Sequence, residues 1–213
     1  MSLFITFEGP EGSGKTTQTQ LLHDTLQQQG YQIVCTREPG GTQIGEQIRT
    51  IVHDRLNSEL VPEAEILLYS AARAQHVAQV IRPALSKGAI VISDRYAEST
   101  FAYQGYGRGL NLDTLHEITQ FATGGLQPDL VIYLDLDVIA GLDRKRQDQA
   151  QGRGEWNRMD EQSLAFYRRV RDGYLAMAAQ AEERWLLVDA AQPVFDIHRV
   201  ILGKIQSLLA ALA

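Results

Sequence analysis

Gly9-Pro10-Glu11-Gly12-Ser13-Gly14-Lys15-Thr16 decides the fold class of this chain of 213 residues. It has the spacing of a phosphate-binding loop: Gly, four free positions, then Gly-Lys followed by Ser or Thr. An apolar run at residues 2–7 precedes it and a helical pattern at residues 16–29 follows it. Glycines let backbone N–H groups turn toward an anion at the helix N-terminus. We predict that Gly9 to Thr16 bind a nucleoside triphosphate, with Lys15 on the terminal phosphates and the Thr16 hydroxyl on Mg²⁺.

Short β-branched runs alternate with longer amphipathic segments along the chain, which is typical of a parallel sheet flanked by helices. We predict strands at Leu3–Glu8, Tyr31–Arg37, Ala89–Asp94, Asp129–Asp135 and Trp185–Asp189. We predict helices at Thr16–Gln29, Ile44–Val52, Glu63–Ser86, Asp113–Ala122, Val138–Arg146, Glu161–Gln180 and Pro193–Ala210. The expected architecture is a three-layer α/β fold, with a five-stranded parallel sheet and helices on both faces, in a single domain over residues 1–213.

Composition limits the partners of the chain. A formal net charge of −6 argues against nucleic-acid binding through bulk electrostatics, because such surfaces are basic. The apolar runs are too short to span a membrane, and the first strand begins too early to leave room for a signal peptide. Cys35 is the only cysteine, so no internal disulfide can form, and we expect a cytoplasmic protein. Within the apolar run Ile33-Val34-Cys35, this cysteine is expected to be a small buried hydrophobe.

A polar stretch at residues 143–160, rich in Gln, Arg and Gly, separates two helical patterns and predicts a mobile lid. It supplies several cations, namely Arg144, Arg146, Arg153 and Arg158.

Polar side chains also stand where the predicted strands end, which in open α/β sheets is where ligands bind. Asp94 ends an apolar strand and is expected to hold Mg²⁺ beside Thr16, with Arg95 facing the same crevice. Arg37 is placed for a forked contact with a phosphate. The alternative for these residues is structural: Asp94 caps the next helix, and both arginines are solvated surface charges.

This supply of arginines favours a kinase whose acceptor is itself a phosphate, because two anionic groups must be brought together. Phosphoryl transfer needs mainly positioning and charge neutralisation, and a phosphate acceptor needs no general base. The guanine-binding motif of GTPases and the Leu-Ser-Gly-Gly signature of transporter ATPases are absent from the sequence. Two alternatives stay open: a kinase for another nucleoside monophosphate, and a regulatory protein that hydrolyses ATP slowly without an acceptor.

Several motifs in order resemble the thymidylate kinase family. They are Phe7-Glu8-Gly9 with the loop that follows, Thr36-Arg37-Glu38-Pro39-Gly40-Gly41-Thr42, Asp94-Arg95-Tyr96, Ser99-Thr100 and Ala102-Tyr103-Gln104-Gly105. The resemblance continues to Val188-Asp189-Ala190 and so covers nearly the whole chain. It implies the fold of P-loop nucleoside monophosphate kinases. It also implies transfer of the γ-phosphoryl group of ATP to thymidine monophosphate (dTMP), giving dTDP for DNA precursor synthesis, with Mg²⁺ as cofactor.

The family is usually homodimeric, and the long apolar segment Glu63–Ser86 would serve as an interface helix.

The resemblance also assigns roles on the acceptor side. Arg37 and Arg95 would clamp the acceptor phosphate, and Glu11 would lie near the sugar 3′-hydroxyl. The base pocket would contain a stacking Tyr69, Arg73 on a thymine carbonyl, Thr100 and Gln104 along its wall, and Tyr103 crowding the sugar 2′ position.

The small residue Gly12 is similar to the bacterial-type layout, in which the lid rather than the P-loop supplies an arginine. Arg153 or Arg158 would then reach the phosphates, while Arg144 would pack against the adenine. The chain departs from the family pattern at Asn157, where an Asp commonly precedes the arginine.

Overall fold

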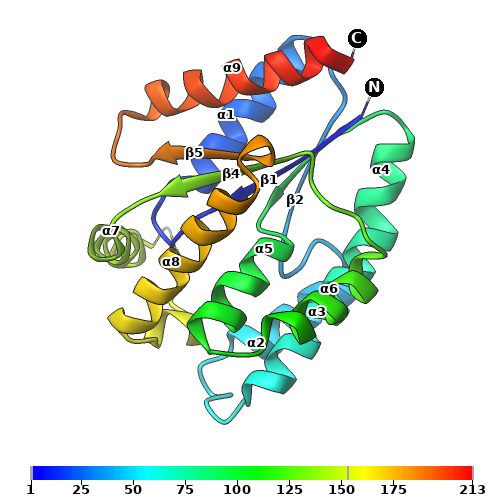
Figure 1. The fold of residues 1–213 in the computed structure, drawn as a ribbon. Helices are drawn as coiled ribbons and strands as arrows, with labels where there is room; N and C mark the ends of the chain where they lie inside the picture. The colour runs from blue at the N-terminus through cyan, green and yellow to red at the C-terminus, as the bar shows by residue number, and fades with distance from the viewer. Residues whose placement is uncertain (1, 153, 213) are drawn as a thin grey trace.

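The five predicted strands form one parallel sheet in the computed structural model, which describes residues 2–152 and 154–212. The strand order is β2-β3-β1-β4-β5, so the strand that leads into the P-loop lies at the centre (Figure 1). All four pairings are parallel, and the carboxyl ends of the strands therefore meet at one edge of the sheet. The strands are β1 (Leu3–Glu8), β2 (Ile33–Arg37), β3 (Ile90–Asp94), β4 (Leu130–Asp135) and β5 (Trp185–Asp189). The predicted fold class is confirmed.

Helices alternate with the strands as predicted, and most boundaries of the predicted helices differ by only a few residues. The helical segment at residues 97–107 was not predicted from the sequence. The α-helices are α1 (Lys15–Gln28), α2 (Gln43–His53), α3 (Pro62–His76), α4 (Arg82–Ser86), α5 (Ala97–Thr100), α6 (Leu112–Thr123), α7 (Val138–Ala150), α8 (Leu164–Gln180) and α9 (Val194–Leu212). Two π-helical segments, η1 (Val77–Ile81) and η2 (Phe101–Gly107), and two 3-10 turns, η3 (Arg158–Glu161) and η4 (Glu182–Arg184), complete the set.

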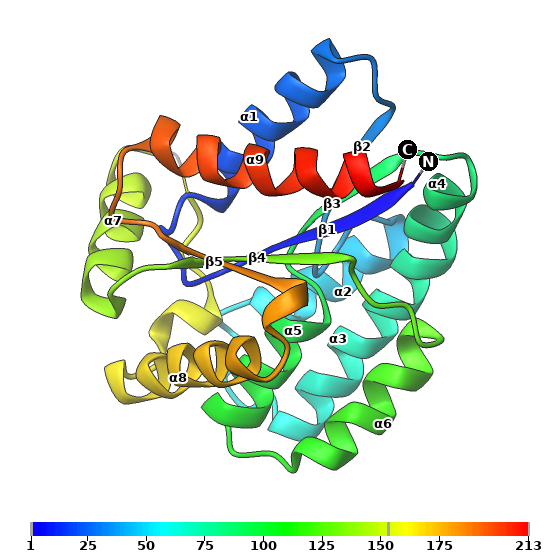
Figure 2. The ribbon, with the colours of Figure 1, turned by 45° about the horizontal axis from the view of Figure 1, so that its top comes forward.

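The sheet lies between two helical layers. Helices α1 and α9 cover one face, while α3, α5, α6 and α8 cover the other (Figure 2). Successive residues of β1 divide between these layers: Leu3, Ile5 and Phe7 pack with α1 and α9, and Phe4 packs with the opposite core. Because both faces are buried, the strands have continuous apolar runs rather than an alternating pattern.

The predicted helix Glu63–Ser86 follows one helical path but contains a π-helical turn. Pro83 lies just inside α4, and it lacks an N–H while its ring crowds the carbonyl one turn earlier. The wider turn η1 lies directly before α4 and accommodates the change in the hydrogen-bond ladder. α3, η1 and α4 therefore follow one another without a break as one helical rod.

The prediction that Cys35 is buried is wrong. Its strand, β2, is an edge strand, and Cys35 is exposed there. Strand position in the sheet, which the local sequence does not encode, decides the exposure of this side chain.

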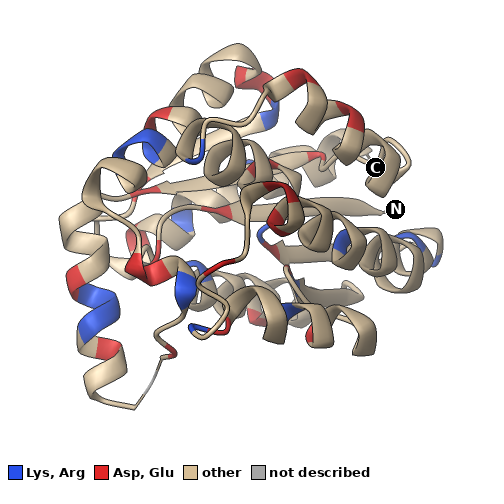
Figure 3. Ribbon diagram, turned by 90° about the horizontal axis from the view of Figure 1, so that it is seen from below, with Lys and Arg blue, Asp and Glu red and all other residues tan. Residues whose placement is uncertain are grey.

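Among the residues that the structure describes, no helix is long and apolar enough to cross a membrane. In the ribbon of Figure 3, positions of Lys and Arg are interspersed with positions of Asp and Glu. This mixture of signs agrees with the net charge of −6.

Candidate functional site

A pocket of about 1420 Å³ opens where the strands end. It brings together residues from the P-loop, the β2–α2 loop, α3, the β3–α5 turn, η2 and α7. The predicted site residues that line it are Glu11, Gly12, Gly14, Lys15, Thr16, Arg37, Tyr69, Arg73, Asp94, Arg95, Thr100, Tyr103, Gln104 and Arg144. Gly9, Pro10 and Ser13 belong to the loop but are not among the lining residues, and neither is Arg158. Arg153 lies outside the described residues.

The P-loop joins β1 to α1 through three glycines with positive φ: Gly9 at 147°, Gly12 at 71° and Gly14 at 90°. Gly14 is the N-cap of α1, so the backbone N–H groups of the first helical turn are free of intrahelical bonds. The Lys15 ammonium donates to the carbonyl oxygens of Gly9 (3.1 Å) and Pro10 (3.0 Å). Burial lowers the pKa of Lys15, and the nearby charge of Arg95 lowers it further. The loop thus holds one cation and a helix N-terminus against the same wall of the pocket.

Gly12 packs against α7, because a Cβ atom at this position would overlap the carbonyl oxygen of Gly141. The same contact excludes an arginine at position 12 and therefore fits the layout in which the lid carries that charge. We expect Gly12→Ala to weaken the binding of magnesium ATP about tenfold or more, because the loop must shift to relieve the overlap. Calorimetric titration with magnesium ATP measures the change.

Gly30→Ala is the matched control for Gly12→Ala. Gly30 also has positive φ, at 89°, but a Cβ there meets nothing within 4 Å. Both variants incur about 1–2 kcal/mol of left-handed strain, and only Gly12→Ala adds a clash in the loop. Equal ATP affinity in the two variants would show that the contact with Gly141 does not shape the nucleotide site.

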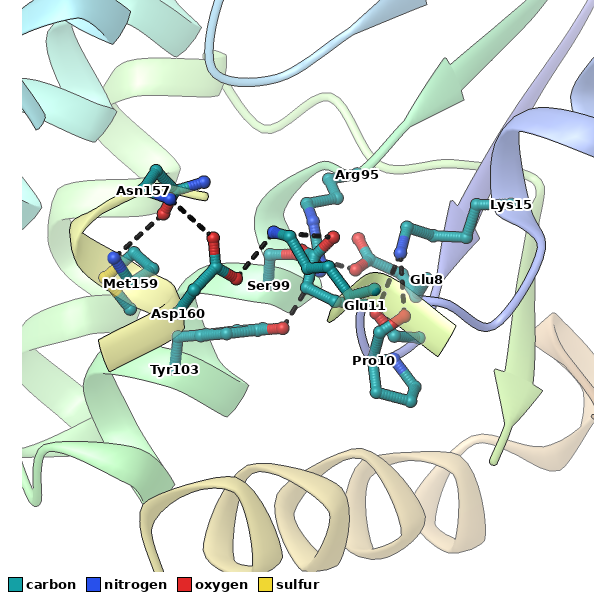
Figure 4. Close-up of polar contacts among 12 residues, drawn as sticks. Glu8, Pro10, Glu11, Lys15, Arg95, Ser99, Tyr103, Asn157, Met159 and Asp160 are labelled. Carbon is teal, nitrogen blue, oxygen red and sulfur yellow. Dashed lines mark hydrogen bonds and ion pairs between the residues drawn. The ribbon is translucent and has the colours of Figure 1, made fainter. Parts of the chain in front are cut away.

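Arg95 is the only residue other than glycine with a positive φ in the described part of the chain, at 72°. Hydrogen bonds hold its backbone there: its N–H donates to Phe7 O (2.9 Å), and the following N–H, of Tyr96, donates to Glu8 Oε1 (2.8 Å). The guanidinium donates to Glu11 Oε1 (2.5 Å) and to the Tyr103 hydroxyl (3.2 Å). Backbone strain of this kind is typical of functional sites. The β3–α5 turn thus directs one cation across the pocket toward the P-loop carboxylate (Figure 4).

Glu8 anchors this turn from the end of β1. Its Oε2 accepts from the hydroxyls of Ser99 (2.6 Å) and Tyr174 (2.7 Å), which themselves lie beside the Arg95 guanidinium. Burial raises the pKa of Glu8, against the opposing effect of Arg95.

A second buried carboxyl, Glu98, lies one residue before Ser99, and its Oε2 has no hydrogen-bond partner among the described residues. Burial and the charge of Glu8 raise the pKa of Glu98 from 4.5 to about 7. Between these values the folded chain binds more protons than the unfolded chain. The free energy of unfolding therefore falls as pH rises through this window.

Glu98→Gln is expected to remove the loss of stability that ionisation of the buried Glu98 carboxyl causes as pH rises. At pH 8 the variant should have a free energy of unfolding about 2–3 kcal/mol above that of the wild type, and near pH 4.5 the gain should vanish. Urea denaturation at both pH values measures it, with Glu117→Gln on the exposed face of α6 as control. A gain of the same size at both pH values would contradict the ionisation of a buried Glu98.

The predicted base pocket lies between α3 and η2. Arg73 is buried, and its guanidinium donates to Glu38 Oε2 (2.7 Å), Thr100 Oγ1 (2.8 Å) and the carbonyl of Tyr96 (2.9 Å). Tyr69 lies one turn earlier on α3, and burial together with the charge of Glu65 raises its pKa. These contacts fix Arg73 in one orientation along the pocket wall.

Glu38 itself is held from the other side by His76, whose Nδ1 lies 2.9 Å from Glu38 Oε1, and the Glu38–Pro39 peptide bond is cis.

Three further predicted arginines, which belong neither to the β3–α5 turn nor to the base pocket, lie in different surroundings. Arg144 projects from α7 and donates to the carbonyls of Gly12 (3.4 Å) and Ala190 (3.3 Å), beside the P-loop. Arg37 is half exposed and pairs with Glu46 at 3.0 Å. Arg158 is buried, bonds Glu65 and the carbonyl of Val52 (3.0 Å), and is not brought into the pocket in this conformation.

Several residues in and around the pocket were given no role by the sequence. Lys145 and Arg49 line the pocket and bring further positive charge to it. Glu8, Ser99 and Tyr174 form the network under Arg95, and of these three only Ser99 lines the pocket. Lys145 had one available signal, because it follows Arg144 in the polar stretch. Tyr174 had none, since its partner Glu8 is distant in the sequence.

Comparison with known proteins gives a consistent result. The thymidylate kinase family model matches residues 7–201. The chain is 50% identical over 219 residues to a thymidylate kinase of Roseiflexus sp. (strain RS-1), covering 100% of this chain and 97% of the relative. It is 51% identical over 210 residues to that of Herpetosiphon aurantiacus, covering 89% of each. A crystal structure of thymidylate kinase from Ehrlichia chaffeensis matches with a TM-score of 0.76 at 32% identity, covering 96% of this chain and 98% of that one.

Proposed function

The chain belongs to the thymidylate kinase family and phosphorylates dTMP to dTDP, and we propose that the transfer from ATP takes place within the pocket at the strand ends. The observation that supports this location is the arrangement around Glu11. The P-loop lysine lies on one side of the pocket, and Arg95 reaches the same loop from the β3–α5 turn. A donor phosphate on the P-loop and an acceptor phosphate on Arg95 would therefore meet.

On the donor side, the P-loop amides and Lys15 hold the β- and γ-phosphates, and Arg144 packs against the adenine. Mg²⁺ takes oxygen ligands and usually retains phosphate and water among them. The Asp94 carboxylate and the Thr16 hydroxyl both line the pocket and fit this preference. In the described residues no group of three His, Cys, Asp or Glu could hold a metal alone, so the nucleotide would supply further ligands. The ion would screen the charge between the phosphates.

On the acceptor side, Arg95 and Arg37 bind the phosphate of dTMP, and Glu11 lies by the 3′-hydroxyl. Tyr69 stacks on the base, Arg73 donates to a carbonyl of thymine, and Thr100 and Gln104 line the base pocket. Tyr103 crowds the 2′ position and so favours a deoxyribose. The support for this orientation is that the Arg73 and Thr100 side chains bond each other at the pocket wall while Tyr103 contacts Arg95.

Residues 143–160 act as a lid within a single kinase domain. Closure would bring Arg153 or Arg158 to the phosphoryl group in transit, with Arg158 first leaving its contacts with Glu65 and Val52. We also propose that the enzyme is a cytoplasmic homodimer in which the rod of α3, η1 and α4 contributes to the interface. Exposed Leu67 on α3 supports this surface.

The proposal is tested by measuring ATP-to-ADP turnover with Mg²⁺ and each common nucleoside and deoxynucleoside monophosphate in turn. We expect strong activity with dTMP and weak activity with the uridine and guanosine forms. Preference for another acceptor would keep the kinase mechanism and remove Arg73, Thr100 and Gln104 as thymine-reading residues. ADP formation that is independent of any acceptor would instead indicate a regulatory ATPase.

A further inference from the structure

Lys145 of α7 forms two ion pairs in the pocket, although none of the roles above requires it. Its Nζ lies 2.5 Å from Asp160 Oδ1 and 3.5 Å from Glu11 Oε2, and only 12% of the side chain is exposed. The first partner is the last residue of the lid segment, and the second belongs to the P-loop. Lys145 therefore joins two parts of the site that are far apart in the sequence.

These pairs extend into a row of alternating charges. Arg95 contacts one oxygen of Glu11, Lys145 lies nearer the other oxygen, and Asp160 contacts Lys145 from the far side. Figure 4 shows Arg95, Glu11 and Asp160 along this row. The four residues come from the β3–α5 turn, the P-loop, α7 and η3.

We propose that Lys145 is a positioning residue that fixes Glu11, and through it Arg95, in the orientation that receives the acceptor nucleotide. The inference rests on the proposed function, because Glu11 and Arg95 are the residues placed on the acceptor side. In this role Lys145 acts through Glu11 rather than through a contact of its own with the substrate.

Glu11 needs such a partner because a third of its side chain is exposed. A carboxylate held by Arg95 alone can turn about its own bonds, whereas cations at both oxygens define its plane. Burial raises the pKa of Glu11, but Arg95, Lys15 and Lys145 together outweigh burial and hold the pKa well below its usual range. The carboxylate therefore stays charged, and the ion pairs persist at neutral pH.

Asp160 anchors Lys145 to the 3-10 turn η3, at the C-terminal end of the lid segment. Its side chain is 1% exposed, and its Oδ2 accepts from the backbone N–H of Asn157 (2.7 Å) in the cap of η3. A carboxylate this deeply buried is costly without a cation beside it. The hydrogen bond from the Asn157 backbone holds Asp160 in place, and Asp160 in turn holds Lys145. The position of the turn η3 therefore affects the position of Glu11.

The two substrates should then differ in their response to the loss of Lys145. The P-loop backbone amides and Lys15 hold the donor phosphates. The ion pairs of Lys145 in the described residues are with the side chains of Glu11 and Asp160. The acceptor depends on Glu11 and Arg95. Lys145→Met keeps the length of the side chain and removes its charge. It should lower kcat/KM for dTMP about 10- to 100-fold, as expected when a site residue loses its alignment. The KM for ATP should change less than about threefold.

The experiment compares the full-length wild type with Lys145→Met, Lys145→Arg and Lys87→Met, the last being the same substitution on the exposed turn after α4. Steady-state kinetics vary dTMP at saturating ATP and ATP at saturating dTMP, and thermal unfolding is followed for each protein. We expect Lys145→Arg to recover most of the lost kcat/KM for dTMP, because it keeps the charge. Lys87→Met should behave as the wild type.

Three outcomes would overturn the inference: kcat/KM for dTMP within twofold of the wild type in Lys145→Met, equal losses for both nucleotides, or no recovery in a folded Lys145→Arg. Equal losses of kcat/KM for dTMP and for ATP would indicate that Lys145 binds the transferred phosphoryl group directly. The wild type separates this failure from failure of the proposed function. A wild-type enzyme without dTMP-dependent turnover refutes the function, whereas an active wild type with an unchanged Lys145→Met refutes only the role of Lys145.

Discussion

Arg95→Ala is expected to lower kcat about a thousandfold, while the KM for ATP stays within a few-fold of the wild-type value. Arginines that neutralise charge in phosphoryl transfer contribute about 10³–10⁵ in rate. The guanidinium of Arg95 lies in the pocket against Glu11 and Tyr103, whereas the donor site is built by the P-loop. Its loss should therefore affect transfer more than ATP binding. Steady-state kinetics with dTMP at saturating ATP measure this effect.

The substitution isolates the side chain, because Ala and Arg carry the same penalty at a φ of 72°. Arg199→Ala, at a largely exposed site on α9, is the control for removing a positive charge. Unchanged turnover in Arg95→Ala would remove Arg95 from the mechanism. A loss matched by Arg199→Ala would show that net charge, rather than position, is responsible.

Glu65→Gln is expected to lower the free energy of unfolding by about 3–5 kcal/mol, the usual effect of breaking a buried ion pair from one side. Glu65 of α3 has no exposed surface, and its carboxylate contacts Arg108 (2.9 Å), Gln104 (2.8 Å) and Arg158. The variant would leave two guanidinium groups short of their counter-charge. Urea denaturation at pH 7 gives the free energy.

The pH dependence of the Glu65 contribution has a definite sign. Burial raises the pKa of Glu65, but Arg108 and its other partners lower it below the usual 4.5 overall. Its stabilisation is therefore complete above about pH 4.5 and is lost as pH falls through the folded pKa.

Glu161→Gln is the matched control for Glu65→Gln, since Glu161 pairs with Arg55 at the surface and such pairs contribute about 0–1 kcal/mol. Equal effects of the two substitutions would mean that the cluster around Glu65 adds no more than a surface pair.

The parts of the site that could be predicted from the sequence are those in which local spacing fixes geometry. The P-loop glycines follow a strand and precede a helix, so the positions of Lys15 and Thr16 at the pocket follow from the motif and the parallel sheet. Asp94 ends β3, the neighbour of β1 in the sheet, and Arg95 follows it directly. Parallel strands place their carboxyl ends together. The turn spacing of Tyr69 and Arg73 likewise puts both on one face of α3.

What could not be predicted depends on contacts between distant segments. Arg158 is a lid arginine by sequence, yet it bonds Glu65, which lies 93 positions earlier in the chain. The exposure of Cys35 depends on β2 being an edge strand, and a run such as Ile33-Val34-Cys35 also fits a central strand. The π-helical segment η2 differs from an α-helix in its hydrogen-bond ladder, which residue periodicity over seven residues does not reveal.

The central claim, direct transfer of the γ-phosphoryl group from ATP to dTMP, is tested most directly by following the label of γ-labelled ATP in the presence of Mg²⁺ and dTMP. We predict that the label appears in dTDP in equal amount to the ADP formed, and that little is released as inorganic phosphate. Label that appears in inorganic phosphate at the same rate with and without dTMP would contradict the claim.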